Sequence, residues 1–77
     1  MTFREWIKAT GVGRMAGIIG YPEATIYSWS RRGDIPQGAW VDIVFKFAEI
    51  GLSDLKAMHI ASEADRIAYA RTEAASK

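Results

Sequence analysis

The sequence predicts an all-α fold, a compact bundle of about five helices. Apolar residues recur at spacings of three and four along most of the chain, and no stretch alternates polar and apolar residues between turn signals. Hydrophobic residues make up 49% of the 77 residues, which is enough to build one small core. The whole chain, residues 1–77, is therefore expected to form a single domain.

The first helix is expected to begin after Thr2. Glu5 follows three residues later, and this spacing is typical of a capping box at a helix start. Gly11 and Gly13 are expected to stop the helix. Its core-facing residues are predicted to be Phe3, Trp6 and Ile7.

Residues 12–31, VGRMAGIIGYPEATIYSWSR, have the pattern of a helix-turn-helix. The small side chain of Ala16 allows two helices to cross closely, and Gly20 can adopt the positive φ needed where the first helix ends, at about Ile19. Pro22 suits the first turn of a second helix that runs to about Arg31. The inward-facing residues, with Tyr21 closing the corner between the helices, are predicted to be Met15, Ile19, Ile26 and Trp29.

This pattern resembles the helix-turn-helix of lambda-repressor-like and Cro-like phage and prophage regulators. The resemblance continues through RRGDIPQGAW and covers roughly the first fifty residues. The chain departs from the family at Tyr21, where a small β-branched residue is commoner, and at Pro22 and Glu23, where small polar residues often meet DNA. The resemblance implies a sequence-specific, double-stranded-DNA-binding transcriptional regulator that needs no cofactor, with repression as the expected outcome.

The candidate DNA-binding residues follow from helix geometry. If Ile26 and Trp29 face inward, an outward arc of roughly 140° is left on the predicted recognition helix. Arg31, or Arg32 beside it, could bind guanine or a phosphate, and Arg31 is the better placed for a base. Arg14, near the start of the preceding helix, is a candidate for a phosphate contact. The remaining candidates are Glu23, Ala24, Thr25, Tyr27 and Ser28.

Three of these candidates also have a purely structural interpretation. Thr25 can pack beside the preceding helix, and Tyr27 can cover the edge of the core. Glu23 can interact with the positive end of its own helix. The sequence thus predicts the DNA-facing side of the helix without assigning a contact to each residue.

After a turn at residues 32–34, a fourth helix is expected from Pro36 to Ile50. Its polar residues, Asp42, Lys46 and Glu49, form one narrow stripe, while apolar residues cover the rest of the surface. Such a helix is expected to be buried on several sides. The chain is expected to leave this helix at Gly51, and Ser53 to cap the next helical region.

In the C-terminal segment, 53–77, Leu55 and Met58 share one helix face. A second stripe lies about opposite to them on a continuous helix and consists of Ile60, Ala64, Ile67, Arg71 and Ala74. Either the helix breaks near Ser62, or it packs on both sides. In the second case one face completes the core and the other contacts a second subunit, which predicts a homodimer. The alternative is that the alanine-rich tail is a solvated or frayed helix.

Net charge and targeting signals set broad limits on function. The formal net charge is only +1, but residues 1–40 hold five basic and three acidic side chains, so the basic excess lies with the helix-turn-helix pattern. No apolar run approaches a membrane span, and the N-terminal residues lack the order of a signal peptide, which predicts a cytoplasmic protein that joins the nucleoid when bound to DNA. The low charge and Glu23 keep a second hypothesis open, a protein-interaction module of the same shape.

No pattern in the sequence predicts catalysis, a cofactor or a metal site. The segment GVGRMA, residues 11–16, matches a dinucleotide-binding fingerprint but follows a predicted helix, not a strand. There is no cysteine, and His59, the single histidine, has no neighbouring ligand set in the sequence. Nor does any serine or carboxylate have the surroundings of an active site. The protein is expected not to be an enzyme.

Overall fold

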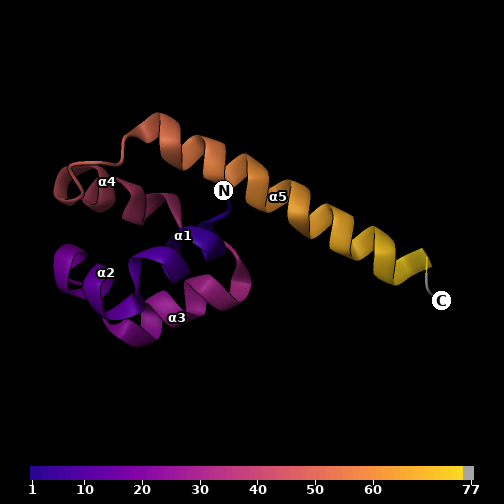
Figure 1. Ribbon diagram of the computed structural model, residues 1–77, viewed down its shortest axis with the longest axis horizontal. Coiled ribbons are helices and arrows are strands. Elements are labelled where there is room, and N and C mark those ends of the chain that lie inside the picture. The colour runs from indigo at the N-terminus through magenta and orange to yellow at the C-terminus, as the bar shows by residue number, and fades with distance from the viewer. Residues whose placement is uncertain (76–77) are drawn as a thin grey trace.

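The computed structural model describes residues 1–75, and the side chains of residues 1–71. Within that range the chain forms five helices and no strands, as the sequence predicts. They are α1 (Phe3–Thr10), α2 (Val12–Ile19), α3 (Glu23–Arg32), α4 (Gln37–Lys46) and α5 (Leu52–Ala75). The first four helices cluster together, whereas α5 runs across α4 and α1 and extends well beyond them (Figure 1). None of these helices combines the length and apolar character required to cross a membrane.

The core draws apolar residues from all five helices. Helix α1 packs against α2, α3 and α5, and α4 lies between α2 and α5. All the residues predicted to face inward in the first three helices are buried, which confirms that part of the prediction. The buried apolar residues are Phe3, Trp6, Ile7, Met15, Ile19, Ile26, Trp29, Ile35, Ala39, Trp40, Ile43, Phe47, Leu55 and Met58.

The predicted capping box at the start of α1 is present. The Thr2 hydroxyl accepts the Glu5 N–H at 3.1 Å, and the Glu5 carboxylate accepts the Thr2 N–H at 2.8 Å. Hydrogen bonding to Thr2, mainly through its backbone N–H and to a smaller extent through its hydroxyl, holds the pKa of Glu5 below its usual value. Gly11, with φ of 93°, ends α1 by donating its N–H to the Ile7 carbonyl. Gly13 lies inside α2, so one glycine and not two forms this boundary.

The connection between α2 and α3 is held from two sides. Gly20 ends α2 in the left-handed conformation, with φ of 76°, and Pro22 caps the start of α3. The Tyr21 ring lies 5.2 Å from the Trp29 ring, which confirms its place at the corner. Lys46 of α4 donates from Nζ to the Ile19 carbonyl at 3.2 Å and so satisfies a free acceptor at the end of α2.

Helix α4 is shorter and less buried than the sequence predicts. It starts after Pro36 and ends at Lys46, because Phe47 adopts an extended conformation and packs edge-on against Trp6 at 5.4 Å. Phe47 thus packs against α1 from outside the helix, and the predicted extension of α4 to Ile50 is wrong. Burial on several sides is also wrong for the single chain, because the side of α4 that faces away from the core is exposed. Its uncovered apolar side chains are Val41, Val44 and Phe45.

Helix α5 is continuous from Leu52 to Ala75, so the first of the two alternatives, a break near Ser62, is wrong. At its start the Gly51 N–H is accepted by the Asp54 carboxylate at 2.9 Å, so the predicted cap at Ser53 is wrong. Ser62 instead docks α5 onto α1, since its hydroxyl donates to the Met58 carbonyl at 2.8 Å and accepts the Phe3 N–H at 3.0 Å.

The second apolar stripe of α5 is uncovered in the single chain. Ile60 is 67% exposed and Ile67 is 52% exposed, so the helix does not pack on both sides within one molecule. Ala74, the last member of the stripe, and the end of the predicted 53–77 segment lie outside the residues whose side chains are described. The described apolar members of the stripe, Ile60, Ala64 and Ile67, thus form an exposed surface.

Candidate nucleic-acid interface

Helix α3 is anchored on one side and open on the other. Ile26 and Trp29 are fully buried, which fixes the rotation of the helix on the core. At about 100° per residue, the middle of the opposite side is formed by Ala24, Tyr27 and Arg31, all of which are exposed. We call this side the α3 outer face; together with its two edge residues it consists of Glu23, Ala24, Tyr27, Ser28 and Arg31. The predicted orientation of the helix is therefore confirmed.

Thr25 and Ser28 occupy less open positions. Both are partly buried, and Thr25 lies on the side of the helix that leads toward the core, at about 100° from Ala24. Tyr27 is well exposed. The structural interpretation, in which Tyr27 covers the edge of the core, is therefore wrong. Tyr27 is thus available on the outer face, while Thr25 lies beside it.

Positive charge gathers at the C-terminal end of α3. Arg31 and Arg32 are the last two residues of the helix, both exposed, and Gly33 closes it with φ of 68°. Arg4 of α1 donates from Nε to the Ser30 carbonyl at 2.9 Å and from Nη2 to the Arg31 carbonyl at 3.1 Å. The Ser30 carbonyl also accepts the Gly33 N–H at 3.2 Å, and the negative end of the helix dipole favours a cation there. Three guanidinium groups therefore share this end.

Arg4 was not among the predicted site residues. It lies 26 residues from Ser30 in sequence, and no local pattern links the two. The only sequence signal that includes it is the basic excess in residues 1–40. Because its hydrogen bonds are used on α3, Arg4 positions the helix end and adds charge, while Arg31 and Arg32 form no ion pair within the described part of the chain.

At the other end of α3, Glu23 lies beside α2. A Cβ atom placed on Gly13 would be 4.0 Å from Oε1 of Glu23, so the carboxylate sits close to the first turn of α2. It also stands in the first turn of its own helix, where the dipole stabilises negative charge. The structural interpretation of Glu23 therefore fits its position, although the side chain remains exposed.

Arg14 is directed to the residues that follow α4. Its Nη2 lies 3.5 Å from Oε1 of Glu49, and its Cζ lies 5.9 Å from the centre of the Phe47 ring. The structure therefore does not bring Arg14 together with the α3 outer face. An exposed pair of this kind contributes about 0.2–1 kcal/mol at most, so a phosphate can displace Glu49 at small cost.

The hydroxyl of Tyr21 ties the α2–α3 corner to α4 and makes one pH dependence testable. It donates to Oδ2 of Asp42 at 2.7 Å, and this hydrogen bond raises the pKa of Tyr21 above its usual value. The folded chain thus holds the phenol proton more tightly than the unfolded chain. The resulting stabilisation is fully present below the unfolded pKa of about 10 and is lost as the pH rises through the raised value.

We expect Asp42→Asn to bring the pKa of Tyr21 back toward its usual value, because the carboxylate acceptor is removed while the shape is kept. The measurement is an NMR titration of the tyrosine ring signals, with Tyr21→Phe used to assign the resonance. A pKa that is the same in Asp42→Asn and in the unmodified chain would contradict this account of the corner.

No protein-family model matches the chain, and no significant match was found among curated proteins or solved structures. The described residues offer three features that can carry a function: the open α3 outer face, the basic end of α3 and the exposed apolar surfaces of α4 and α5.

Proposed function

We propose that this chain is a sequence-specific DNA-binding transcriptional regulator, in which α2 and α3 act as a helix-turn-helix and α3 enters the major groove. The observation that carries the proposal is the combination of an anchored helix with an open outer face and two exposed cations at its end, Arg31 and Arg32, which form no ion pair with the described residues. The major groove, about 12 Å wide, admits one α-helix. Repression by occupying a promoter is the expected outcome, and no cofactor is required.

The side chains of the α3 outer face match the groups that the major groove presents. Arg31 can form two hydrogen bonds with O6 and N7 of guanine, and Arg32 can hold a phosphate. Ala24 and Tyr27 offer apolar contacts to a thymine methyl group, and Ser28 offers a hydroxyl. Arg4 keeps the helix end in place while adding a third positive charge near the backbone of the DNA.

A homodimer is part of this proposal. The apolar side chains exposed on α4 continue onto α5, where Leu52, Ile60 and Ile67 fall within about 80° of the helix circumference. We call this surface the α4–α5 face; it consists of Val41, Val44, Phe45, Leu52, Ile60 and Ile67. Large contiguous apolar patches on soluble proteins commonly mark interaction sites. Two copies joined here would present two α3 helices to two half-sites.

The shape of the α4–α5 face suits pairing with itself. Phe45 is 84% exposed and stands beside an apolar hollow of about 390 Å³. A two-fold axis brings the same patch of both copies together, so each Phe45 ring can enter the hollow of the other copy. The hollow is lined by Gln37, Trp40, Val41, Val44, Phe45, Leu52 and Lys56.

The proposed function is tested by the salt dependence of DNA binding. The protein is titrated onto a random duplex and onto a duplex selected from a random pool, at roughly 50 mM and 200 mM salt. Two neutralised phosphates already give a slope of about −1.8, so affinity is expected to fall at least about tenfold over this range. The selected duplex should bind more tightly than the random one at both salt concentrations.

The contrary outcome is equally specific. If no DNA binds at the lower salt concentration, the proposal fails, and the alternative of a protein-interaction module gains support. The uncovered α4–α5 face and the net charge of only +1 are the features that favour this alternative. Salt-dependent binding without any preference for the selected duplex would contradict the sequence-specific part of the proposal.

A further inference from the structure

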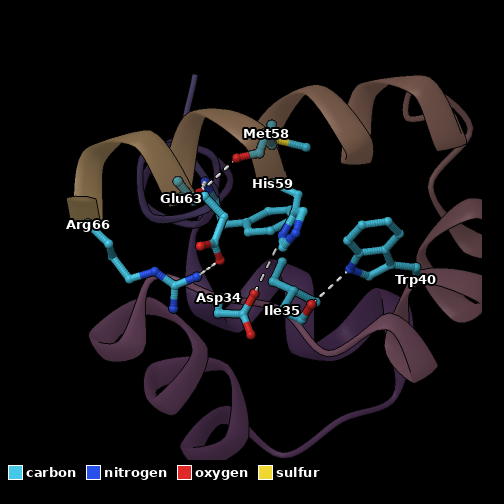
Figure 2. A network of polar contacts seen from close by, with 9 residues as sticks. Asp34, Ile35, Trp40, Met58, His59, Glu63 and Arg66 are labelled. Carbon is cyan, nitrogen blue, oxygen red and sulfur yellow. Dashed lines mark hydrogen bonds and ion pairs between the residues drawn. The ribbon is translucent and has the colours of Figure 1, made fainter. Parts of the chain in front are cut away.

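A cluster of metal-ligating side chains lies where α5 crosses the connection between α3 and α4 (Figure 2). It joins Asp34, in the connection between α3 and α4, to His59 and Glu63, which stand one turn apart on α5. One ligand atom of each residue lies within 4.8 Å of the other two. Figure 2 shows His59 and Glu63 projecting from α5 toward Asp34. All three residues are partly buried, so the cluster is not simply a set of solvated surface charges.

The imidazole of His59 has an unsatisfied nitrogen within this cluster. Its ring packs against the rings of Phe3, at 6.2 Å, and Trp40, at 5.7 Å, which limits its rotation. Nδ1 is shielded from solvent and makes no hydrogen bond in the described part of the chain. The nearest carboxylate oxygen, Oδ1 of Asp34, is 3.8 Å away, which is too long for a hydrogen bond. A buried polar atom without a partner is costly, and a bound cation would supply one.

We propose that Asp34, His59 and Glu63 bind a divalent first-row transition-metal ion, for which Zn²⁺ is the probe. A zinc ion lies about 2.0–2.2 Å from nitrogen and oxygen ligands, so tetrahedral ligands are roughly 3.3 Å from one another. Side-chain rotation, mainly of the two carboxylates, would bring the three donors from within 4.8 Å of one another to this spacing, and water would fill the remaining position. One imidazole and two carboxylates suit zinc better than Ca²⁺ or Mg²⁺, which prefer oxygen ligands throughout.

Arg66 is the competitor for this site. It stands one turn beyond Glu63 on α5 and forms an ion pair and hydrogen bond with the Glu63 carboxylate. Both side chains are about half exposed, and a pair of this kind is weak enough for a divalent ion to displace. Removing the guanidinium should therefore strengthen metal binding. A bound ion would link α5 directly to the residue that follows Gly33, the C-cap of α3.

The test uses the full chain without a histidine tag. His59 is the single histidine, so the ring signals of one imidazole in a proton–nitrogen NMR spectrum report on this site alone. On titration with Zn²⁺ we expect these signals to shift and to saturate at one ion per chain. Asp34→Asn and Glu63→Gln should each weaken binding at least about tenfold, because each removes a charged ligand while keeping the shape.

Two further variants make the result specific to the cluster. Arg66→Gln should tighten zinc binding, since it frees Glu63, whereas Asp65→Asn, an exposed acid on the same helix and outside the cluster, should leave the affinity unchanged. Circular dichroism without metal checks that each variant keeps the helical fold. The proposal would be overturned if the His59 signals did not shift at saturating Zn²⁺. It would also be overturned if Asp34→Asn and Glu63→Gln both bound zinc with the affinity of the unmodified chain. The outcome does not depend on DNA binding.

Discussion

Replacing Arg31 with alanine is expected to weaken binding to a selected DNA site by about 1–3 kcal/mol, or roughly five- to 150-fold. The reason is the loss of two hydrogen bonds to a guanine edge, which no neighbouring side chain on the outer face can replace. Fluorescence anisotropy at one fixed salt concentration measures the effect. Specificity should relax at one base position, which a set of duplexes with single substitutions would reveal.

Arg32→Ala is the matched control for that experiment. A phosphate contact carries no sequence information, so this variant should weaken binding to all duplexes about equally and reduce the salt slope by about one. Neither substitution disturbs the helix end, because Arg4 bonds to backbone carbonyls and alanine favours helix. If Arg31→Ala binds the selected duplex as tightly as the unmodified chain, Arg31 has no base contact.

The N-terminal half of the fold could be predicted from the sequence because its signals are local. The Thr2–Glu5 capping box involves residues three positions apart, and the left-handed end of α2 depends on Gly20 alone. The inward stripes likewise repeat within a single turn, as in Ile26 and Trp29. These patterns also fixed the rotation of α3, and hence which of its residues face outward.

The features that sequence reasoning missed depend on contacts between distant segments. Arg4 reaches the end of α3 across 26 residues, and Arg14 of α2 pairs with Glu49 in the connection between α4 and α5. Asp34 and His59 lie close together only because α5 crosses the α3–α4 connection. For this reason the direction of the α3 outer face was predictable, whereas the surroundings of Arg14 and the Asp34–His59–Glu63 cluster were not.

Helix α4 shows a different limit of prediction from sequence. Its sequence is apolar on most sides, and that pattern predicts burial without saying which molecule covers each side. Ala39, Trp40 and Ile43 face the core, while Phe45 and its neighbours are left open. The end of the helix was also misplaced, since Phe47 is buried by leaving the helical path, a choice that depends on Trp6 and not on any local signal.

The open side of α4 leads to the second prediction. Phe45→Gln is expected to convert a dimer into a monomer at micromolar concentration, because a polar amide replaces the ring that fills the partner's hollow. The monomer should fold normally, since Phe45 is 84% exposed and contributes nothing to the core. Sedimentation equilibrium measures the change in mass. If the unmodified protein is already a monomer at this concentration, the dimer is removed from the proposal.

The same variant separates pairing from DNA recognition. On an operator with two half-sites, losing the pair is expected to lower affinity about 10²–10⁴-fold, whereas binding to one half-site should be unchanged. Tyr69→Gln is the matched control, because Tyr69 is also highly exposed but lies about 160° from Ile67 around α5. Equal losses in Phe45→Gln and Tyr69→Gln would place the subunit contact elsewhere. Arg31→Ala should give the opposite result, a dimer of unchanged mass that binds each half-site weakly, so a failure of pairing and a failure of base contact can be told apart.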